Sequence, residues 1–244
     1  MSTPDPNIFN LENTAKIHAL CQIPAEARNK SWTVSFLQFL PTASMTCGDP
    51  QIFTGPDGLP YFALNIPKQG QSFESYSLVH VLNYVTDSGV GIAINPSVDR
   101  APDWVFSYGD LWNFRQTGQF IPETPRFANS TGADQSGEVK EARPVLIGQP
   151  NNELLPDYVR KALDHTLRNH FKIELPSVFL MIDEGLNPKQ NLVFNVFERN
   201  FADPQEFAFA KNYLSWALPR DYGLIGIDPD SDLAQHFAAL VATN

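Results

Sequence analysis

The sequence has few of the residues and segments on which several protein classes depend. Only two cysteines occur among 244 residues, Cys21 and Cys47, too few for a disulfide framework and too far apart for a CxxC motif. No apolar run approaches the ~20 residues of a membrane-spanning helix. The N-terminus lacks the basic and apolar regions of a signal peptide. We therefore expect a cytoplasmic protein without a membrane span.

Charge is also scarce, and it is unbalanced. Charged residues make up 18% of the chain, below the ~25% of an average soluble protein. Lys and Arg number 17 against 27 Asp and Glu, so the net charge is −10. Nucleic-acid binding needs clustered Lys and Arg, so we expect no nucleic-acid partner. An acidic surface attracts a basic protein partner instead. The sequence does not indicate an oligomeric state.

The common enzyme motifs are absent. The chain has no GxxxxGK[ST], GxSxG or HExxH pattern. The glycines of "GVGIAI" precede a predicted strand rather than follow it, unlike those of a dinucleotide site. "DPDSD" begins like an EF-hand with Asp228, Asp230 and Asp232, but Leu233 and Ala239 replace the loop glycine and the closing glutamate. We predict no catalytic residues, metal or cofactor, and favour a protein that is not an enzyme.

What the sequence does contain is many turns and a large core. The chain has 20 prolines and 18 phenylalanines. Its clearest discontinuity lies at 121–143, which is dense in Pro, Gly, Ser, Thr and charge and predicts a linker or a long loop. We therefore predict an N-terminal α+β domain at 1–120 with a helical N-terminal extension, and a C-terminal α+β domain at 144–244.

The C-terminal part has a clear order of predicted elements. A strand at 144–150 precedes a helix whose apolar residues lie four apart, namely Leu155, Val159, Leu163, Leu167 and Phe171. Two strands then lie on either side of the turn "EGLNPKQ". A helix follows with an Asp203 cap and Pro204 in its first position, then the strand "GLIGI" and a terminal helix from Asp228. The first six elements have the order of a ferredoxin-like split βαβ unit.

The N-terminal part is also predicted to be α+β. Two helices occupy the first 40 residues, and two strands flank the turn "GPDG". A helix with an apolar stripe through Leu78, Val79, Leu82 and Val85 ends at Gly89. The strand "VGIAINP" follows it.

The stretch "DWVFSYGDLWNF" (103–114) contains five aromatic residues. Strand alternation places Trp104 and Phe106 on one face, and Asp110 falls near the N-terminus of a short helix. In one interpretation these rings close the core of the first domain. In the other, a partner or ligand binds to Trp104, Tyr108, Asp110, Trp112 and Arg115. Tyr108 and Trp112 are the rings that the core pattern requires least, so we predict that they form a contact surface.

Several short motifs resemble those of one bacterial family. Asn95-Pro96 ends a strand in the first domain, the second domain opens with a Gly148-x-Pro150 step, and Leu218-Pro219 precedes its last strand. This pattern is similar to that of the SseB-like (enhanced serine sensitivity) proteins over roughly residues 50–230. The resemblance implies a two-domain α+β cytosolic protein and assigns no catalytic residues. The helical segment before residue 45 and the aromatic density of 103–114 depart from the family pattern.

Two functions follow as hypotheses. The first is a non-enzymatic, acidic protein-interaction module, for example with an effector-immunity or chaperone-like role towards a basic partner. The second is a small-molecule sensor whose site lies in a cleft between the domains, because pockets favour such interfaces. In that case Trp104, Tyr108 and Trp112 line the cleft, and Asp110 or Arg115 anchors the ligand.

Overall fold

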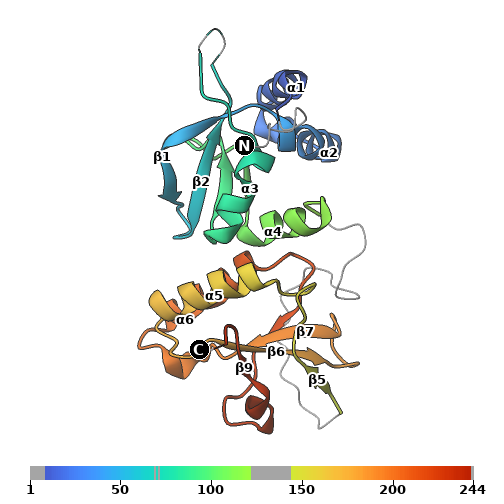
Figure 1. The fold of residues 1–244 in the computed structure, drawn as a ribbon, viewed down its shortest axis with the longest axis vertical. Helices are drawn as coiled ribbons and strands as arrows, with labels where there is room; N and C mark the ends of the chain where they lie inside the picture. Colours follow the sequence, from blue (N-terminus) through green and yellow to red (C-terminus); the bar gives the residue numbers. More distant parts are fainter. Residues whose placement is uncertain (1–8, 69, 71, 122–143, 243–244) are drawn as a thin grey trace. The chain divides into compact units, whose positions relative to one another are not determined.

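A computed structural model describes residues 9–68, 70, 72–121 and 144–242 (Figure 1). The chain divides into two compact units, 1–111 and 112–244, and within the described residues each contains helices and one sheet. The α+β class predicted from the sequence is confirmed. The predicted linker lies outside the described residues from position 122 onwards, and the boundary between the units falls inside helix α4.

The first unit has a sheet of four strands in the order β1-β2-β3-β4. β1 pairs with β2 and β3 with β4 in antiparallel fashion, whereas β2 and β3 are parallel. A parallel pair needs a crossover connection, and α3 supplies it. The elements are α1 (Leu11–Cys21), η1 (Ala25–Ala27), α2 (Lys30–Phe39), η2 (Leu40–Thr42), β1 (Thr46–Thr54), β2 (Pro60–Asn65), α3 (Leu78–Asp87), β3 (Gly91–Ile94), β4 (Trp104–Phe106) and α4 (Tyr108–Thr117).

Helix α3 shows why this part of the chain is helical. The Ser77 side chain accepts a hydrogen bond from the His80 amide and caps the N-terminus. Gly89, with φ of 68°, follows the last turn in the left-handed region. The buried face carries Leu78, Leu82 and Val85 as predicted. The fourth aliphatic position on that face is Val81 rather than Val79, because Val81 lies three residues from Leu78 and four from Val85.

In the second unit, a sheet has the order β5-β6-β7-β8, and β9 pairs with β6. β5-β6, β6-β7 and β6-β9 are antiparallel, and β7-β8 are parallel. The elements are β5 (Leu146–Gly148), α5 (Asp157–Asn169), β6 (Ser177–Ile182), β7 (Gln190–Phe194), η3 (Glu198–Asn200), α6 (Pro204–Ala217), β8 (Leu224–Ile225), η4 (Asp232–His236) and β9 (Ala238–Ala239).

The order of elements in the second unit agrees with the prediction as far as β8, but its sheet does not have the ferredoxin-like arrangement. In a split βαβ unit, the strands that a helix joins are parallel with another strand between them. Here α5 joins the adjacent antiparallel strands β5 and β6, and α6 joins the adjacent parallel strands β7 and β8. β5 is only three residues long and Leu146 is exposed, which suits an edge position.

The predicted terminal helix is wrong. The segment after Asp228 forms the short 3-10 helix η4 and then β9. Leu233 and Phe237 pack on a core cluster formed by Phe179, Met181 and Val193. The Leu240 amide donates to the carbonyl of Pro176, so pairing with β6 replaces the helical hydrogen bonds of this segment.

The two units share an arrangement of two helices and three strands, although their remaining strands pair differently. In each unit, a helix and a Leu-Pro step, Leu40-Pro41 or Leu175-Pro176, precede an antiparallel pair of strands. A second helix then leads to a strand that is parallel to the second member of the pair.

Candidate functional site

The five residues predicted as a site have different neighbours in the structure. Trp104, Tyr108 and Asp110 belong to the first unit, whereas Trp112 and Arg115 belong to the second. Trp104 lies on β4 beside Trp32 and Phe36 of α2, with ring centroids 5.8 and 5.6 Å apart. It is partly exposed, and Phe106 lies on the same face as predicted, with its centroid 6.1 Å from that of Trp104.

Tyr108 and Trp112 do not form the predicted contact surface, because both side chains are 0% exposed. The Tyr108 hydroxyl donates to the carbonyl of Thr86 at 2.9 Å. The Trp112 indole Nε1 donates to the carbonyl of Ala217 at 2.9 Å, and its ring meets Tyr222 edge-on. A buried indole or phenol that has found an acceptor is a packing residue. Both rings are therefore core residues, Tyr108 of the first unit and Trp112 of the second. The interpretation that they close the core of the first domain is correct for Tyr108 and wrong for Trp112.

Asp110 and Arg115 hold local structure. The Asp110 carboxylate accepts from the Ser107 amide at 3.1 Å, and the Ser107 hydroxyl accepts from the Asp110 amide at 3.0 Å. This reciprocal pair is a capping box at the start of α4, and it confirms the predicted place of Asp110 near a helix N-terminus. The Arg115 guanidinium lies 4.1 Å from the centroid of the Tyr158 ring, a cation–π contact.

One buried carboxylate that the sequence did not single out is Asp103. Its side chain is 3% exposed and lies 2.6 Å from Nη2 of Arg28. Arg28 Nη1 donates to the backbone carbonyl of Asp103 at 3.0 Å, and the Asn95 side-chain amide donates to Asp103 Oδ2 at 2.7 Å. Desolvation and the nearby Asp103 charge raise the pKa of the Cys21 thiol to about 12, so this thiol stays protonated.

The Asn95-Pro96 step has a structural role, because the Asn95 side chain donates a hydrogen bond to Asp103. Asn95 is one of two described non-glycine residues with positive φ, at 51°, a region that Asn tolerates better than most residues. Its Oδ1 accepts from the Ile66 amide while its Nδ2 donates to Asp103. The step therefore joins the ends of β2 and β3 to the loop before β4. The Arg28 guanidinium also lies 4.6 Å from the Trp32 ring centroid. Because Arg28 pairs with Asp103 and Trp32 contacts Trp104 of β4, the helical N-terminal segment is packed on the sheet.

The Gly148-x-Pro150 step is likewise held by its neighbours. Arg160 of α5 donates from Nε to the carbonyl of Leu155 and from Nη2 to the carbonyl of Pro150. The Tyr222 hydroxyl donates to the carbonyl of Leu154 at 2.6 Å. Asn95-Pro96 and Gly148-x-Pro150, two of the three steps that resemble the SseB-like pattern, are thus held by hydrogen bonds to neighbouring groups, and catalytic chemistry is not needed to explain them.

Another group of rings, two of them exposed, lies on the outer side of α3. His80 and Tyr84 are exposed one turn apart, and the Tyr76 ring stacks on His80 with centroids 5.8 Å apart. Phe9 meets His80 edge-on at 5.5 Å. We call Phe9, Tyr76, His80 and Tyr84 the α3 aromatic surface. Its signal was present in the sequence as the four-residue spacing of Tyr76, His80 and Tyr84, opposite the apolar stripe.

Within the described residues, histidine, cysteine and carboxylate side chains do not gather in the groups of three or more that hold a metal ion. None of the helices in this part of the chain is both long and apolar enough to span a membrane. Comparisons of the chain with protein-family models, curated proteins and solved structures found no match. The SseB-like resemblance therefore stays a prediction that rests on the short motifs.

Proposed function

We propose that the protein is a non-enzymatic interaction module that binds a basic protein partner. The observation that supports this best is that the polar groups in and beside the predicted motifs form hydrogen bonds and ion pairs within the fold. Asp103 pairs with Arg28, Asp110 caps α4 and Asn95 fixes a left-handed turn. These groups stabilise the fold, and a catalytic constellation instead needs a nucleophile, a base and an orienting group directed at one point.

The composition supplies the second support. A net charge of −10 produces an attractive field for a positively charged protein, which raises the association rate and makes it depend on salt. In this proposal the module belongs to the SseB-like proteins, acts in the cytoplasm, and serves an immunity or chaperone-like role towards a basic effector.

The test is an affinity capture from native lysate, with the full chain immobilised, followed by reconstitution with the purified candidate partner. We expect a stoichiometric partner whose calculated pI is above about 8 and whose association rate falls at least tenfold between 50 and 300 mM NaCl. Recovery of no stoichiometric partner would count against the proposal. So would a partner that is acidic and binds at a rate independent of salt.

A further inference from the structure

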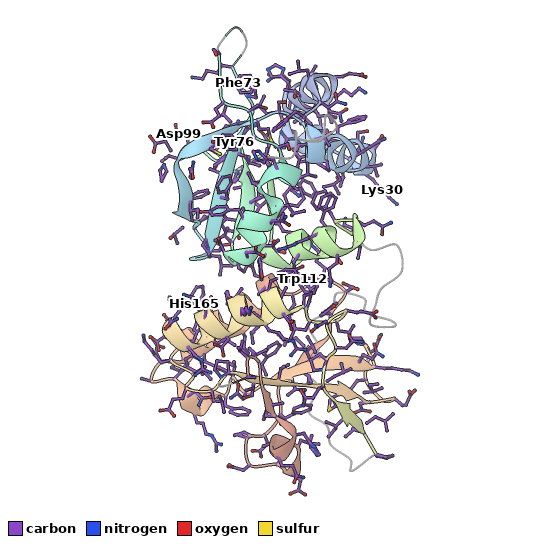
Figure 2. All side chains as sticks on the ribbon, viewed as in Figure 1. Lys30, Phe73, Tyr76, Asp99, Trp112 and His165 are labelled. Atoms are coloured by element: carbon purple, nitrogen blue, oxygen red, sulfur yellow. The ribbon has the colours of Figure 1, made fainter. Side chains whose placement is uncertain are left out.

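The α3 aromatic surface is unusual because two of its four rings, His80 and Tyr84, are exposed on a helix. Tyr84 is 52% exposed and His80 is exposed as well, although both belong to a helix whose opposite face is fully packed. Tyr76 and Phe9 are half-buried beside them. Phe73, which is 37% exposed, lies on the loop that leads to α3, and Tyr76 follows it (Figure 2).

These rings are held in place by the fold. The Tyr76 backbone exchanges two hydrogen bonds with Met45, of 2.6 and 2.8 Å, next to the capped start of α3. The Tyr84 ring packs edge-on against the buried Phe62 ring, with centroids 6.0 Å apart. Binding of a partner to this surface therefore costs little conformational entropy, because the rings are already ordered. Tyrosine is one of the residues enriched at binding hot spots.

The electrostatics of this surface favour a cation. The carboxylate of the exposed residue Glu74 accepts a hydrogen bond from the Tyr76 hydroxyl, which raises the pKa of Tyr76. Glu74 thus places a negative charge beside the Tyr76 ring. A cation over an aromatic face is attracted by the ring quadrupole, and the acidity of the whole chain adds to that attraction.

We infer that the α3 aromatic surface, together with Glu74, is the place where an arginine or lysine side chain of the basic partner docks. In this arrangement the cation lies over the face of Tyr84 or Tyr76, and Glu74 provides its counter-ion. Planar guanidinium stacks on aromatic rings better than ammonium does, so arginine is preferred over lysine. This inference rests on the proposed function and specifies its site.

The experiment measures fluorescence anisotropy of labelled octa-arginine, octa-lysine and octa-glutamate peptides titrated with the full chain at 25 and 150 mM NaCl. We expect the octa-arginine peptide to bind more tightly than octa-lysine, with no binding of octa-glutamate. Tyr84→Leu and Glu74→Gln should each weaken the affinity for octa-arginine about five- to tenfold. Tyr84→Phe, which keeps the ring, should bind like the unsubstituted chain.

Two control variants separate this site from a diffuse acidic surface. Glu26→Gln removes the same charge from another exposed position of the first unit, and Val34→Ala trims an exposed apolar side chain of α2. Both should keep their affinity. Thermal melts check that Tyr84→Leu is folded. If it is not, the affinity of Tyr84→Phe for octa-arginine still tests the contact with the ring.

The possible failures are distinguishable. If Glu26→Gln and Glu74→Gln weaken binding equally, or if Tyr84→Leu binds like the unsubstituted chain, the peptide is held by overall charge; the site is then wrong while the proposed function stands. Weak binding of Tyr84→Phe would also overturn the ring contact. If the unsubstituted chain binds neither basic peptide at 25 mM NaCl, both the site and the preference for a basic partner are wrong.

Discussion

At the scale of single residues, the first unit depends on a charge that lies in its interior. Asp103 is almost completely buried, and Arg28, 75 positions away in the sequence, provides the opposite charge at 2.6 Å. Removing one member of such a pair leaves the other charge buried and uncompensated. Replacing both with apolar side chains is much less harmful.

Asp103→Ala should therefore lower the free energy of unfolding by about 3 kcal/mol, as measured by urea denaturation. The double variant Arg28→Met/Asp103→Leu should lose less than half as much. Asp99→Ala, in the same loop but exposed (Figure 2), should stay within about 0.5 kcal/mol. Equal losses for Asp99→Ala and Asp103→Ala would contradict the importance of the buried pair.

Tyr213 gives a stability that depends on pH. Burial raises the pKa of its phenol from 10.0 to about 12, because the interior disfavours the charged form. The unfolded chain therefore releases this proton first as the pH rises. The contribution of this phenol to the free energy of unfolding is fully present below pH 10 and is lost between pH 10 and 12. The part lost by pH 11 is about 1 kcal/mol.

The corresponding measurement compares the free energy of unfolding at pH 9 and pH 11 for the unsubstituted chain and for Tyr213→Phe. The other tyrosines are common to both proteins, so their titration cancels. We expect the unsubstituted chain to lose about 1 kcal/mol more than the variant over this range. Identical losses would mean that the Tyr213 phenol does not titrate differently in the folded state.

At the scale of elements, two strand glycines differ in what surrounds them. A Cβ atom on Gly91 of β3 would lie 2.6 Å from the carbonyl oxygen of Phe106 and 2.7 Å from the Tyr61 ring. A Cβ on Gly148 of β5 would meet nothing within 4 Å. β3 lies inside the first sheet, whereas β5 lies at the edge of the second.

Gly91→Ala should thus destabilise the protein by about 2 kcal/mol, since the backbone of β4 cannot move away without losing its pairing. Gly148→Ala should change the free energy of unfolding by less than about 0.5 kcal/mol. Thermal melts followed by circular dichroism compare the two variants directly. A larger loss for Gly148→Ala than for Gly91→Ala would show that the strand packing described for β3 is wrong.

Helices with clear periodicity and caps were predictable from the sequence. The apolar positions of α5, the Asp203 cap of α6 and the strand-to-helix change near Gly109 all occur as expected, because their signals are local. The C-terminal segment was not predictable in this way. Its conformation is set by the edge of β6, to which Ala238 and Ala239 pair, and a tertiary contact of this kind overrides helix propensity.

At the scale of the whole molecule, the candidate site was harder to predict than the fold. The density of rings at 103–114 suggests a surface, yet the partners that hold these rings in the core lie far away in the sequence. For example, Trp112 donates to the carbonyl of Ala217 at a separation of 105 residues. The Asp103–Arg28 pair is also not visible as a local sequence pattern, because its two residues are 75 positions apart. By contrast, the α3 aromatic surface has a local sequence pattern, the four-residue spacing of Tyr76, His80 and Tyr84. This pattern identifies a surface only in combination with the exposed side of α3.

The separation of the two sheets along the chain also affects how the protein is made. Each sheet is assembled from one continuous stretch of chain, since the strands of the first all precede Ser107 and the strands of the second all follow Val145. A polypeptide leaves the ribosome from its N-terminus, and domains generally fold as units in that order. The first sheet can therefore complete its hydrogen bonding while the second half is still being translated, and its β1 and β4 edges never have to compete with unpaired strands from β5 to β9.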